Sequence, residues 1–395
     1  MITALLAVTT MAAATAKTKN NADAWDVACR LLQAEKQMQQ GGMEAPNLCV
    51  SPLSLELALA MVAEGASGET ATELSSLLPA NVTNLSKELT SDGQTLTAAN
   101  SIWVNQDIAK NVKKKFIKNN VKKYDAEVTR LAFNPAAVAR INLWCKDKTR
   151  GLIPSIISQL NADDKMVLVN ALYFKAEWKN EFKKNQTHDR PFHLSDGSDI
   201  EVPMMLQTNH LSYAEDDYCQ AVGLPYKQKA DEQSGEPIEK TQYAMYVLLP
   251  KEGIRITDFV NRQLSANYWK QLKFCAEEQV RLQLPKWENN YSTSLVRPLQ
   301  QMGIQRIFSP KAQFGGISKT PLTVGDILQK TYIKVDEKGT EAAAATAVIM
   351  RLTSAAPAKK RPIEMTVDRP FVYFLVETST NTPVFAGIVM NPKTK

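Results

Sequence analysis

The chain has little of what metal binding and hydrolytic catalysis need. Its 395 residues include three histidines, His188, His193 and His210, and five cysteines, none of them in a Cys-x-x-Cys pair. Zinc sites usually draw on such clusters, so we expect no metal and no cofactor. A nucleophile motif of the Gly-x-Ser-x-Gly type is also lacking, which disfavours a Ser-His-Asp triad. The sequence therefore indicates a protein that is not an enzyme.

Long apolar runs and a strong charge imbalance are lacking too. Beyond the first 16 residues no apolar run reaches the roughly 18 residues that span a bilayer. The formal charge of +6 is far below that of a dedicated nucleic-acid binder. We expect neither a membrane nor a nucleic-acid partner. No linker-like stretch or repeat divides the chain, so residues 17–395 are expected to form one large domain, most simply a monomer.

The N-terminus resembles a secretory signal. Residues 2–16 carry no charge and end in Ala14-Thr15-Ala16, a small-x-small pattern, with Lys17 directly after it. No basic residue precedes the apolar run, so the alternative is a disordered or partly helical Ala-rich start. We expect residues 1–16 to be a signal peptide and the protein to be secreted and extracellular. Sequons that would then be glycosylation candidates start at Asn81, Asn84, Asn185 and Asn290.

Helical signals dominate the first 160 residues and strand signals the remainder, which predicts the α+β class. Apolar residues recur at helical spacing from Ala24, and Ser51-Pro52 forms an N-cap followed by a first-turn proline. Short runs of β-forming residues then predict strands. They cover residues 166–174, 243–249, 280–284, 331–335, 371–376 and 384–390, the last two as a hairpin.

Residues 339–362 fit neither the helical spacing of apolar residues nor the alternation that is typical of a strand. Four consecutive alanines, Ala342–Ala345, favour helix by propensity, yet the run lies between two strand-like segments. A loop of about twenty residues within a compact domain is usually functional.

Here the sequence resembles the serpins over nearly its whole length from residue 24. The resemblance rests on motifs that are ordinary one by one but specific in this order: residues 47–54, Gly65, Thr70, Asn142, Trp144, Thr149, Gly151, Asn170, Trp178, 284–286, 335–343 and 368–371. It implies a fold of three β-sheets and about nine helices with an exposed reactive-centre loop, residues 338–362. A protease cuts this loop, which then inserts into the main sheet. The chain is expected to be an inhibitory serpin, most similar to secreted insect and other arthropod members.

The composition of the loop suits insertion as a central strand. Residues 340–354 contain no proline, which would break the hydrogen-bond ladder. Alternate residues from Thr340 would face the interior, where only small uncharged side chains fit. Gly339 supplies backbone freedom. The predicted hinge is Gly339, Thr340, Glu341, Ala342, Ala343, Ala344 and Ala345, and its small residues favour a working inhibitor.

The position of the cut depends on the direction of counting. By resemblance, counting from the hinge glycine places the reactive bond at Thr353-Ser354, whereas counting backward from Pro370-Phe371 gives Lys359-Lys360. We prefer the hinge count, because the length from hinge to cut decides how far a trapped protease is dragged. Thr353 suits elastase-like serine proteases, and Leu352 before it suits papain-like cysteine proteases. Arg351 and Lys359 are the alternative reactive positions for a trypsin-like enzyme.

Two further groups of residues follow from the resemblance and from charge. The sheet-opening region is Ser51, Ser54, Asn170, Trp178 and Gln329, in which Gln329 replaces a family histidine and can donate and accept hydrogen bonds but does not titrate. A run of lysines on a predicted helix is either a solvated face or a site for a glycosaminoglycan or other polyanion. It consists of Lys113, Lys114, Lys115, Lys118, Lys122 and Lys123.

The leading hypothesis is an endopeptidase inhibitor that acts as a suicide substrate and ends in a covalent complex with its target protease. The alternative is a non-inhibitory serpin that serves as a carrier, storage protein or folding helper, for which cleavage would not raise thermal stability.

Overall fold

The computed structural model describes residues 22–38, 46–79, 82, 95–160, 164–228, 242–340 and 361–394. Its helices are α1 (Ala24–Met38), α2 (Pro52–Ala63), α3 (Gly68–Ser75), α5 (Lys114–Tyr124), α6 (Pro135–Lys148), α7 (Ile256–Asp258), α8 (Ala266–Gln271) and α9 (Val296–Gln301). Single turns of 3-10 or π helix lie at Lys184–Gln186, Phe259–Gln263 and Arg306–Phe308. The described part of the chain thus has eight α-helices where the family resemblance predicts about nine.

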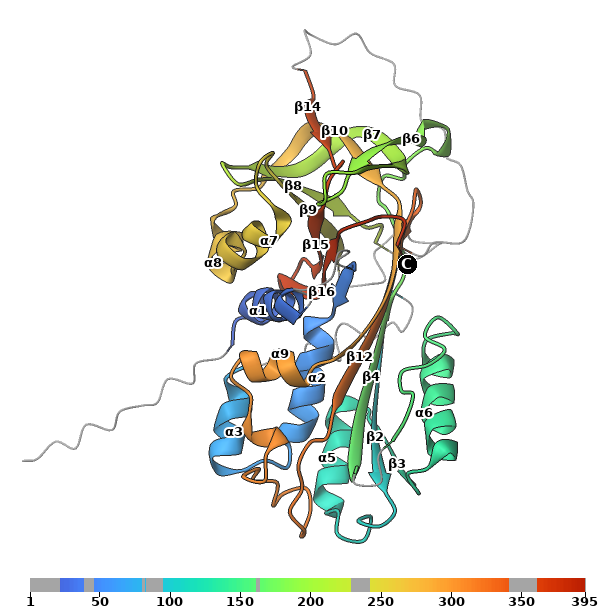
Figure 1. The fold of residues 1–395 in the computed structure, drawn as a ribbon, viewed down its shortest axis with the longest axis vertical. Coiled ribbons are helices and arrows are strands. Elements are labelled where there is room, and N and C mark those ends of the chain that lie inside the picture. Colours follow the sequence, from blue (N-terminus) through green and yellow to red (C-terminus); the bar gives the residue numbers. More distant parts are fainter. Residues whose placement is uncertain are drawn as a thin grey trace, which may run out of the picture.

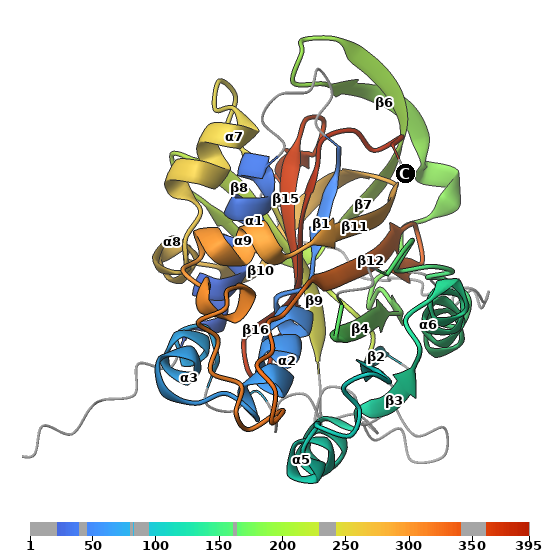
Figure 2. The same cartoon turned by 60° about the horizontal axis from the view of Figure 1, so that its bottom comes forward.

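One sheet, called here the main sheet, has seven strands. They are β3 (Glu127–Leu131), β2 (Leu96–Asn105), β4 (Met166–Phe174), β12 (Ile327–Val335), β11 (Trp287–Ser294), β13 (Gly339–Thr340) and β5 (Ala176–Glu177). In Figure 1 its long strands run along the lower half of the molecule, with α6 on one side and α2, α3, α5 and α9 on the other. Figure 2 shows α1, α7, α8 and α9 gathered opposite α6.

The second hydrogen-bonded network has nine strands. They are β1 (Leu48–Val50), β16 (Thr382–Val389), β15 (Phe371–Glu377), β9 (Tyr243–Pro250), β8 (Cys219–Pro225), β7 (Asp199–Glu215), β10 (Cys275–Pro285), β14 (Ile363–Thr366) and β6 (His188–His193). Strand β7 pairs with β6 and β10 along most of its length but with β8 only through Ser212–Glu215. The network therefore forms two sheets joined by β7, and the three-sheet α+β fold expected from the resemblance is confirmed.

Local sequence signals explain where the helices around the main sheet begin. The Ser51 hydroxyl accepts a hydrogen bond from the Ser54 amide and Pro52 occupies the first turn, so α2 starts where the sequence predicts. Asn134 caps α6 in the same way, accepting from the Ala137 amide. Eleven of the twelve residues of α2 are buried, because the helix packs between the main sheet and strand β16.

The two faces of the main sheet pack against different layers. On β4 the even-numbered residues, such as Leu168 and Leu172, join the large central core, whereas Val167 and Val169 join a second cluster with Trp144 of α6. We call these the inner and outer faces. Cys29, Cys49 and Cys145 are all buried and free, and burial raises the pKa of Cys49 to about 11. Among the helices of the described residues, none is long and apolar enough to cross a membrane.

Candidate functional site

The site begins where strands β4 and β12 lie side by side in the main sheet. They pair in parallel only through four rows, from Leu168–Ile327 to Ala171–Lys330. Above these rows the two strands no longer pair with each other. There β13 lies between β12 and β5, and β5 follows β4 in the chain after Lys175. We call this boundary between β4 and β12 the seam.

The first two hinge residues already occupy the upper end of the seam as β13. Thr340 pairs with Val335 of β12 on one side and with Ala176 of β5 on the other, while Gly339 pairs with Glu177. A Cβ atom on Gly339 would lie 2.1 Å from the Ala176 carbonyl oxygen, so close backbone approach requires glycine there. The remaining predicted hinge residues lie outside the described residues, as do the candidate reactive positions, residues 351–354 and 359.

Aromatic side chains and main-chain hydrogen bonds hold the hinge in place. The Tyr226 and Thr340 hydroxyls lie 2.6 Å apart, and Thr340 is 1% exposed. Trp178 stacks on Tyr226 with ring centroids 4.4 Å apart and donates its indole N–H to the Asp336 carbonyl at 3.0 Å. The Trp178 amide donates to the Lys338 carbonyl. Trp178 was predicted from the resemblance, whereas Tyr226 was missed because its partner lies 114 residues away in the chain.

An ion pair between half-buried Lys286 and buried Glu337 lies directly before the hinge. The Lys286 ammonium donates to a Glu337 carboxylate oxygen at 2.9 Å, and the Thr187 hydroxyl donates to the other oxygen at 3.0 Å. Burial alone would raise the pKa of Glu337, but the hydrogen bonds from Lys286 and Thr187 outweigh it and lower the pKa. Glu337 is therefore ionised at neutral pH. Both residues belong to quoted family motifs, yet nothing in the sequence revealed that they touch.

Four of the five predicted sheet-opening residues, Ser51, Ser54, Asn170 and Gln329, gather at the closed rows of the seam, whereas Trp178 lies at the hinge. The Gln329 side chain accepts from the Ser51 amide at 2.8 Å and donates to the Ser51 carbonyl at 2.9 Å. Asn170 lies beside Gln329 in the sheet, but its amide donates to Asn100 at 2.6 Å and its oxygen accepts from Ser54. Gln329 thus ties β12 to the start of α2, and Asn170 ties β4 to α2 and β2. Asn100 was not anticipated from the sequence.

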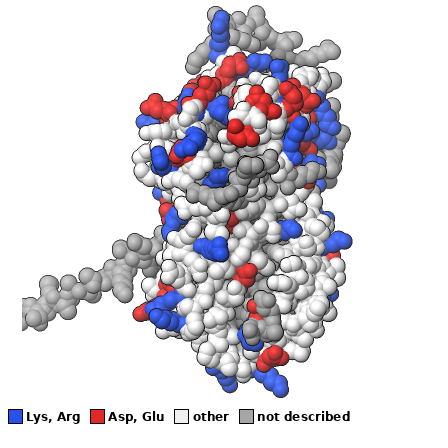
Figure 3. Space-filling view, in the orientation of Figure 1, with Lys and Arg blue, Asp and Glu red and all other residues white. Residues whose placement is uncertain are grey.

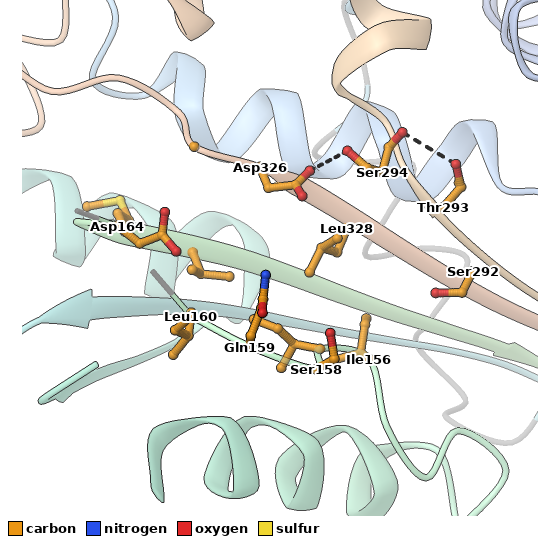
Figure 4. A pocket seen from close by; sticks show the side chains of 14 residues that line it. Ile156, Ser158, Gln159, Leu160, Asp164, Ser292, Thr293, Ser294, Asp326 and Leu328 are labelled. Atoms are coloured by element: carbon orange, nitrogen blue, oxygen red, sulfur yellow. Dashed lines mark hydrogen bonds between the residues drawn. The ribbon is translucent and has the colours of Figure 1, made fainter. Parts of the chain in front are cut away.

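A cavity of about 370 Å³ lies over the lower end of the seam. Figure 4 shows Ile156, Ser158, Gln159 and Leu160 along one side, Asp326, Ser294 and Thr293 along the other, and Leu328 pointing between them. The Ser294 hydroxyl donates to Asp326 at 2.6 Å. Val167 of β4 also lines the cavity, so it opens on the outer face of the sheet where β4 and β12 meet.

The predicted lysine run lies on α5 and at the residue before it. Five of these six side chains have no ion pair with any described carboxylate, whereas Lys123 pairs with Glu64 at 2.6 Å. All six are exposed. At the opposite end of the molecule, charged side chains of both signs gather over β6, β7, β10 and β14 (Figure 3). The described chain resumes at this end with residue 361, directly before β14.

The geometry and sequence together define the family. A family model described as Serpin (serine protease inhibitor) matches residues 23–392, and the chain belongs to this family. Serpins are in general protease inhibitors, although the family also includes carriers. An uncharacterized serpin-like protein of the archaeon Thermococcus kodakarensis is 36% identical over 88% of this chain and 81% of its own length. Rice Serpin-ZXA is 31% identical over 88% and 90%, and bovine leukocyte elastase inhibitor is 30% identical over 88% and 94%.

Solved structures agree with this assignment. The native thermophilic serpin tengpin has a TM-score of 0.77 and 28% identity over 95% of this chain and 96% of its own. Native protease nexin-1 with heparin has a TM-score of 0.75 and 26% identity, over 93% of this chain and 99% of its own. Thyroxine-binding globulin with thyroxine has a TM-score of 0.76 and 25% identity, over 93% and 98%. The expected likeness to arthropod serpins in particular is not supported. The relatives named above come from an archaeon, a plant and a mammal, and Serpin48 of the beetle Tenebrio molitor, at 24% identity and a TM-score of 0.78 over 93% and 97%, shows the fold alone.

Proposed function

We propose that this protein inhibits an endopeptidase as a suicide substrate. The observation that carries the proposal is the seated hinge: Gly339 and Thr340 already form a strand between β12 and β5, in line with the seam. A cut further along the loop would free residues 341–353 to continue this strand downward. The four rows of pairing between β4 and β12 would then have to separate to admit the inserted strand.

The register of β13 indicates which loop residues would face which side. Thr340 pairs with Val335 and Ala176 in antiparallel fashion, so counting forward along the loop corresponds to counting backward along its neighbours. Thr346 lies six residues after Thr340. Gln329 lies six residues before Val335, and Asn170 lies six residues before Ala176. Gln329 and Asn170 already pair with each other across the seam. The register counted along β12 and the register counted along β5 and β4 therefore place Thr346 in the same row. Thr346 would enter this row on the inner face, together with the small residues Ala342 and Ala344 above it.

The same register leads an outward-facing side chain to the cavity of Figure 4. Ile349 lies nine residues beyond Thr340, and Val167 and Asp326 lie nine residues before Ala176 and Val335. Both of these residues line the cavity, together with the apolar side chains of Ile156 and Leu328. The cavity would receive Ile349 once the strands part. Burial of an isoleucine contributes about 1.5–3 kcal/mol, which would stabilise the inserted state.

The chemistry assigns the covalent step to the protease. Its serine or cysteine attacks the carbonyl carbon of Thr353, the amide bond to Ser354 breaks, and the amine of Ser354 leaves with the C-terminal part of the chain. The thirteen residue-to-residue steps from Thr340 to Thr353 then span roughly 43 Å as a strand. A protease bound to Thr353 as an acyl-enzyme would be carried that far before water can release it. The elastase-like or papain-like preference rests on Thr353 and Leu352.

The test is a denaturing gel with intact-mass analysis after mixing the protein separately with trypsin, a leukocyte-type elastase and a papain-like enzyme. We expect a stable complex and a released peptide that begins at Ser354. Cleavage without complex for all three would support the carrier or storage alternative. A peptide beginning at Leu352 or Lys360 would move the reactive bond to Arg351 or Lys359.

Two further proposals concern partners and location. The α5 lysines that have no ion pair within the described part of the chain are proposed to bind a glycosaminoglycan or similar polyanion, which the heparin complex of related protease nexin-1 supports by analogy. Loss of heparin binding in a variant with Lys118 and Lys122 changed to glutamate would test this.

Residues 1–16 are proposed to be removed on secretion. N-terminal sequencing of the exported protein tests this proposal, and Lys17 is the expected first residue.

A further inference from the structure

A second concave site opens beside the hinge, on strands β7, β8 and β9. It is a groove of about 550 Å³, within the size range of small-molecule sites in proteins. Its lining includes the charged and polar residues Lys179, His210, Lys227 and Glu277 and the aromatic residues Tyr226 and Tyr246. The groove belongs to neither the seam nor the cavity of Figure 4.

The walls of this groove are rigid. The Tyr246 ring packs edge-on against Trp269 and Phe274, with ring centroids 5.0 Å and 5.1 Å away. Gly223 makes room for it, since a Cβ there would lie 2.8 Å from the Tyr246 ring. On the facing side a register shift in β10 places Glu277 at φ 62°, and His210 holds its carbonyl through Nδ1 at 2.9 Å. A ligand would therefore find a preformed aromatic slot.

The charge around the groove favours an anion. Lys179 and Lys227 are exposed at its rim, and Glu277 is the one carboxylate among the lining residues. Lys227 is partly compensated by Glu177 at 3.7 Å. Lys179 has no ion pair with any carboxylate in the described part of the chain. Ammonium groups beside the Tyr226 and Tyr246 rings suit a molecule that is flat and apolar at one end and negatively charged at the other.

We propose that this groove binds a small aromatic organic anion, a carboxylate or sulfonate, and that its occupancy is linked to the hinge. The link is Tyr226: its ring lines the groove, while its hydroxyl lies 2.6 Å from that of Thr340. A ligand that packs on Tyr226 fixes the ring in the orientation that holds Thr340 in the sheet. Linkage is reciprocal, so a seated hinge must strengthen ligand binding by the same factor. Neither binding nor linkage requires inhibitory activity.

The binding test uses 8-anilino-1-naphthalenesulfonate, an aromatic anion that fluoresces when bound, with the full-length protein. We expect saturable binding of one molecule, displaced by 2-naphthoate but at least tenfold less well by neutral 2-naphthamide or by non-aromatic cyclohexanecarboxylate. Changing Lys179 and Lys227 together to glutamate should weaken binding about tenfold, because two attractions become repulsions. The matched control changes two exposed lysines outside the groove, Lys311 and Lys319, to glutamate and should bind normally.

Equal binding in the wild-type protein and the Lys179→Glu/Lys227→Glu variant would overturn the site, and equal displacement by 2-naphthamide would overturn the anionic ligand. The linkage is tested with Thr340→Arg, whose side chain is too large for a position that is 1% exposed, and with the milder Thr340→Val. We expect the arginine variant to bind the probe at least fivefold more weakly and the valine variant about threefold, for the loss of one hydrogen bond. Unchanged affinity in both would refute the linkage while leaving the inhibitor proposal untouched.

Discussion

The register of the seated hinge predicts that two adjacent alanines of the loop respond oppositely to a negative charge. Continuing the β13 pairing, Ala344 would lie beside Thr331 and Leu172, which are each 1% exposed and face inward. Ala345 would lie on the outer face beside Lys330, which is half-buried. Ala344→Glu should therefore block insertion, and Ala345→Glu should permit it.

The magnitude follows from the surroundings of each position. An unpaired carboxylate buried on the inner face costs several kcal/mol, and we take about 4 kcal/mol. If half of this cost is felt in the transition state of insertion, the rate falls about 30-fold. Hydrolysis of the acyl-enzyme is then faster than loop insertion, so the protease cleaves the Ala344→Glu variant as an ordinary substrate and is released. For Ala345→Glu the ammonium of Lys330 offsets the added charge, so inhibition should change less than threefold.

The assay is the stoichiometry of inhibition, measured with whichever protease forms the stable complex. A second readout is thermal unfolding before and after cleavage by a non-target protease within the loop. We expect cleavage to raise the melting temperature of the wild-type protein and of Ala345→Glu, but not of Ala344→Glu. If the two variants behave alike, or if Ala345→Glu is the more damaged one, the register derived from β13 is wrong.

Three further predictions concern described residues. Both carboxylate oxygens of Glu56 are buried with no hydrogen-bond partner among the described residues, and burial raises the pKa of Glu56 well above the usual range. The free-energy cost of its ionised form therefore grows as pH rises above the ordinary carboxyl pKa. Glu56→Met should gain about 1–3 kcal/mol at pH 7 and less near pH 4 in chemical denaturation; no gain would contradict this. Glu337→Gln should lose about 1–3 kcal/mol at pH 7 because it removes the charge that pairs with Lys286. Since hydrogen bonding lowers the pKa of Glu337, this loss should shrink as pH falls below about 4, and a pH-independent loss would argue against the ion pair. Removing the charges of Lys118 and Lys122 together should reduce the slope of log affinity for heparin against log salt by about 2, if each lysine displaces one counterion; an unchanged slope would exclude α5 as the site.

Local signals in the sequence predicted most of the elements around the site. Ser51-Pro52 marked the start of α2, and the alternation around Thr331–Val335 marked β12, because caps and side-chain periods depend on neighbouring residues. The family resemblance supplied the hinge and Trp178. The bond of Gln329 to the main chain of Ser51, rather than to its sheet neighbour Asn170, could not be predicted from the residue types alone.

The features that the sequence did not reveal all depend on long-range packing. Tyr226 reaches Thr340 across 114 residues, and Asn100 reaches Asn170 across 70. Tyrosine and asparagine are common in strands and turns, so neither residue type marks a functional contact. The groove beside Tyr246 depends on a backbone irregularity at Glu277 in another strand, which no local pattern announces.

Because β13 is already paired on both edges, the proposed insertion of the loop would need no separate nucleation step. Starting a strand is the slow event when chain segments must first be ordered without compensating contacts, and here that ordering is complete before any protease arrives. What remains is propagation, one residue at a time, against four rows of parallel pairing between β4 and β12. The inserted strand has thus already started at the upper end of the seam, and it would only have to extend as β4 and β12 separate. The speed of this extension is set by how readily those four rows peel apart, and so by Asn170, Gln329 and the serines of α2 that hold them closed.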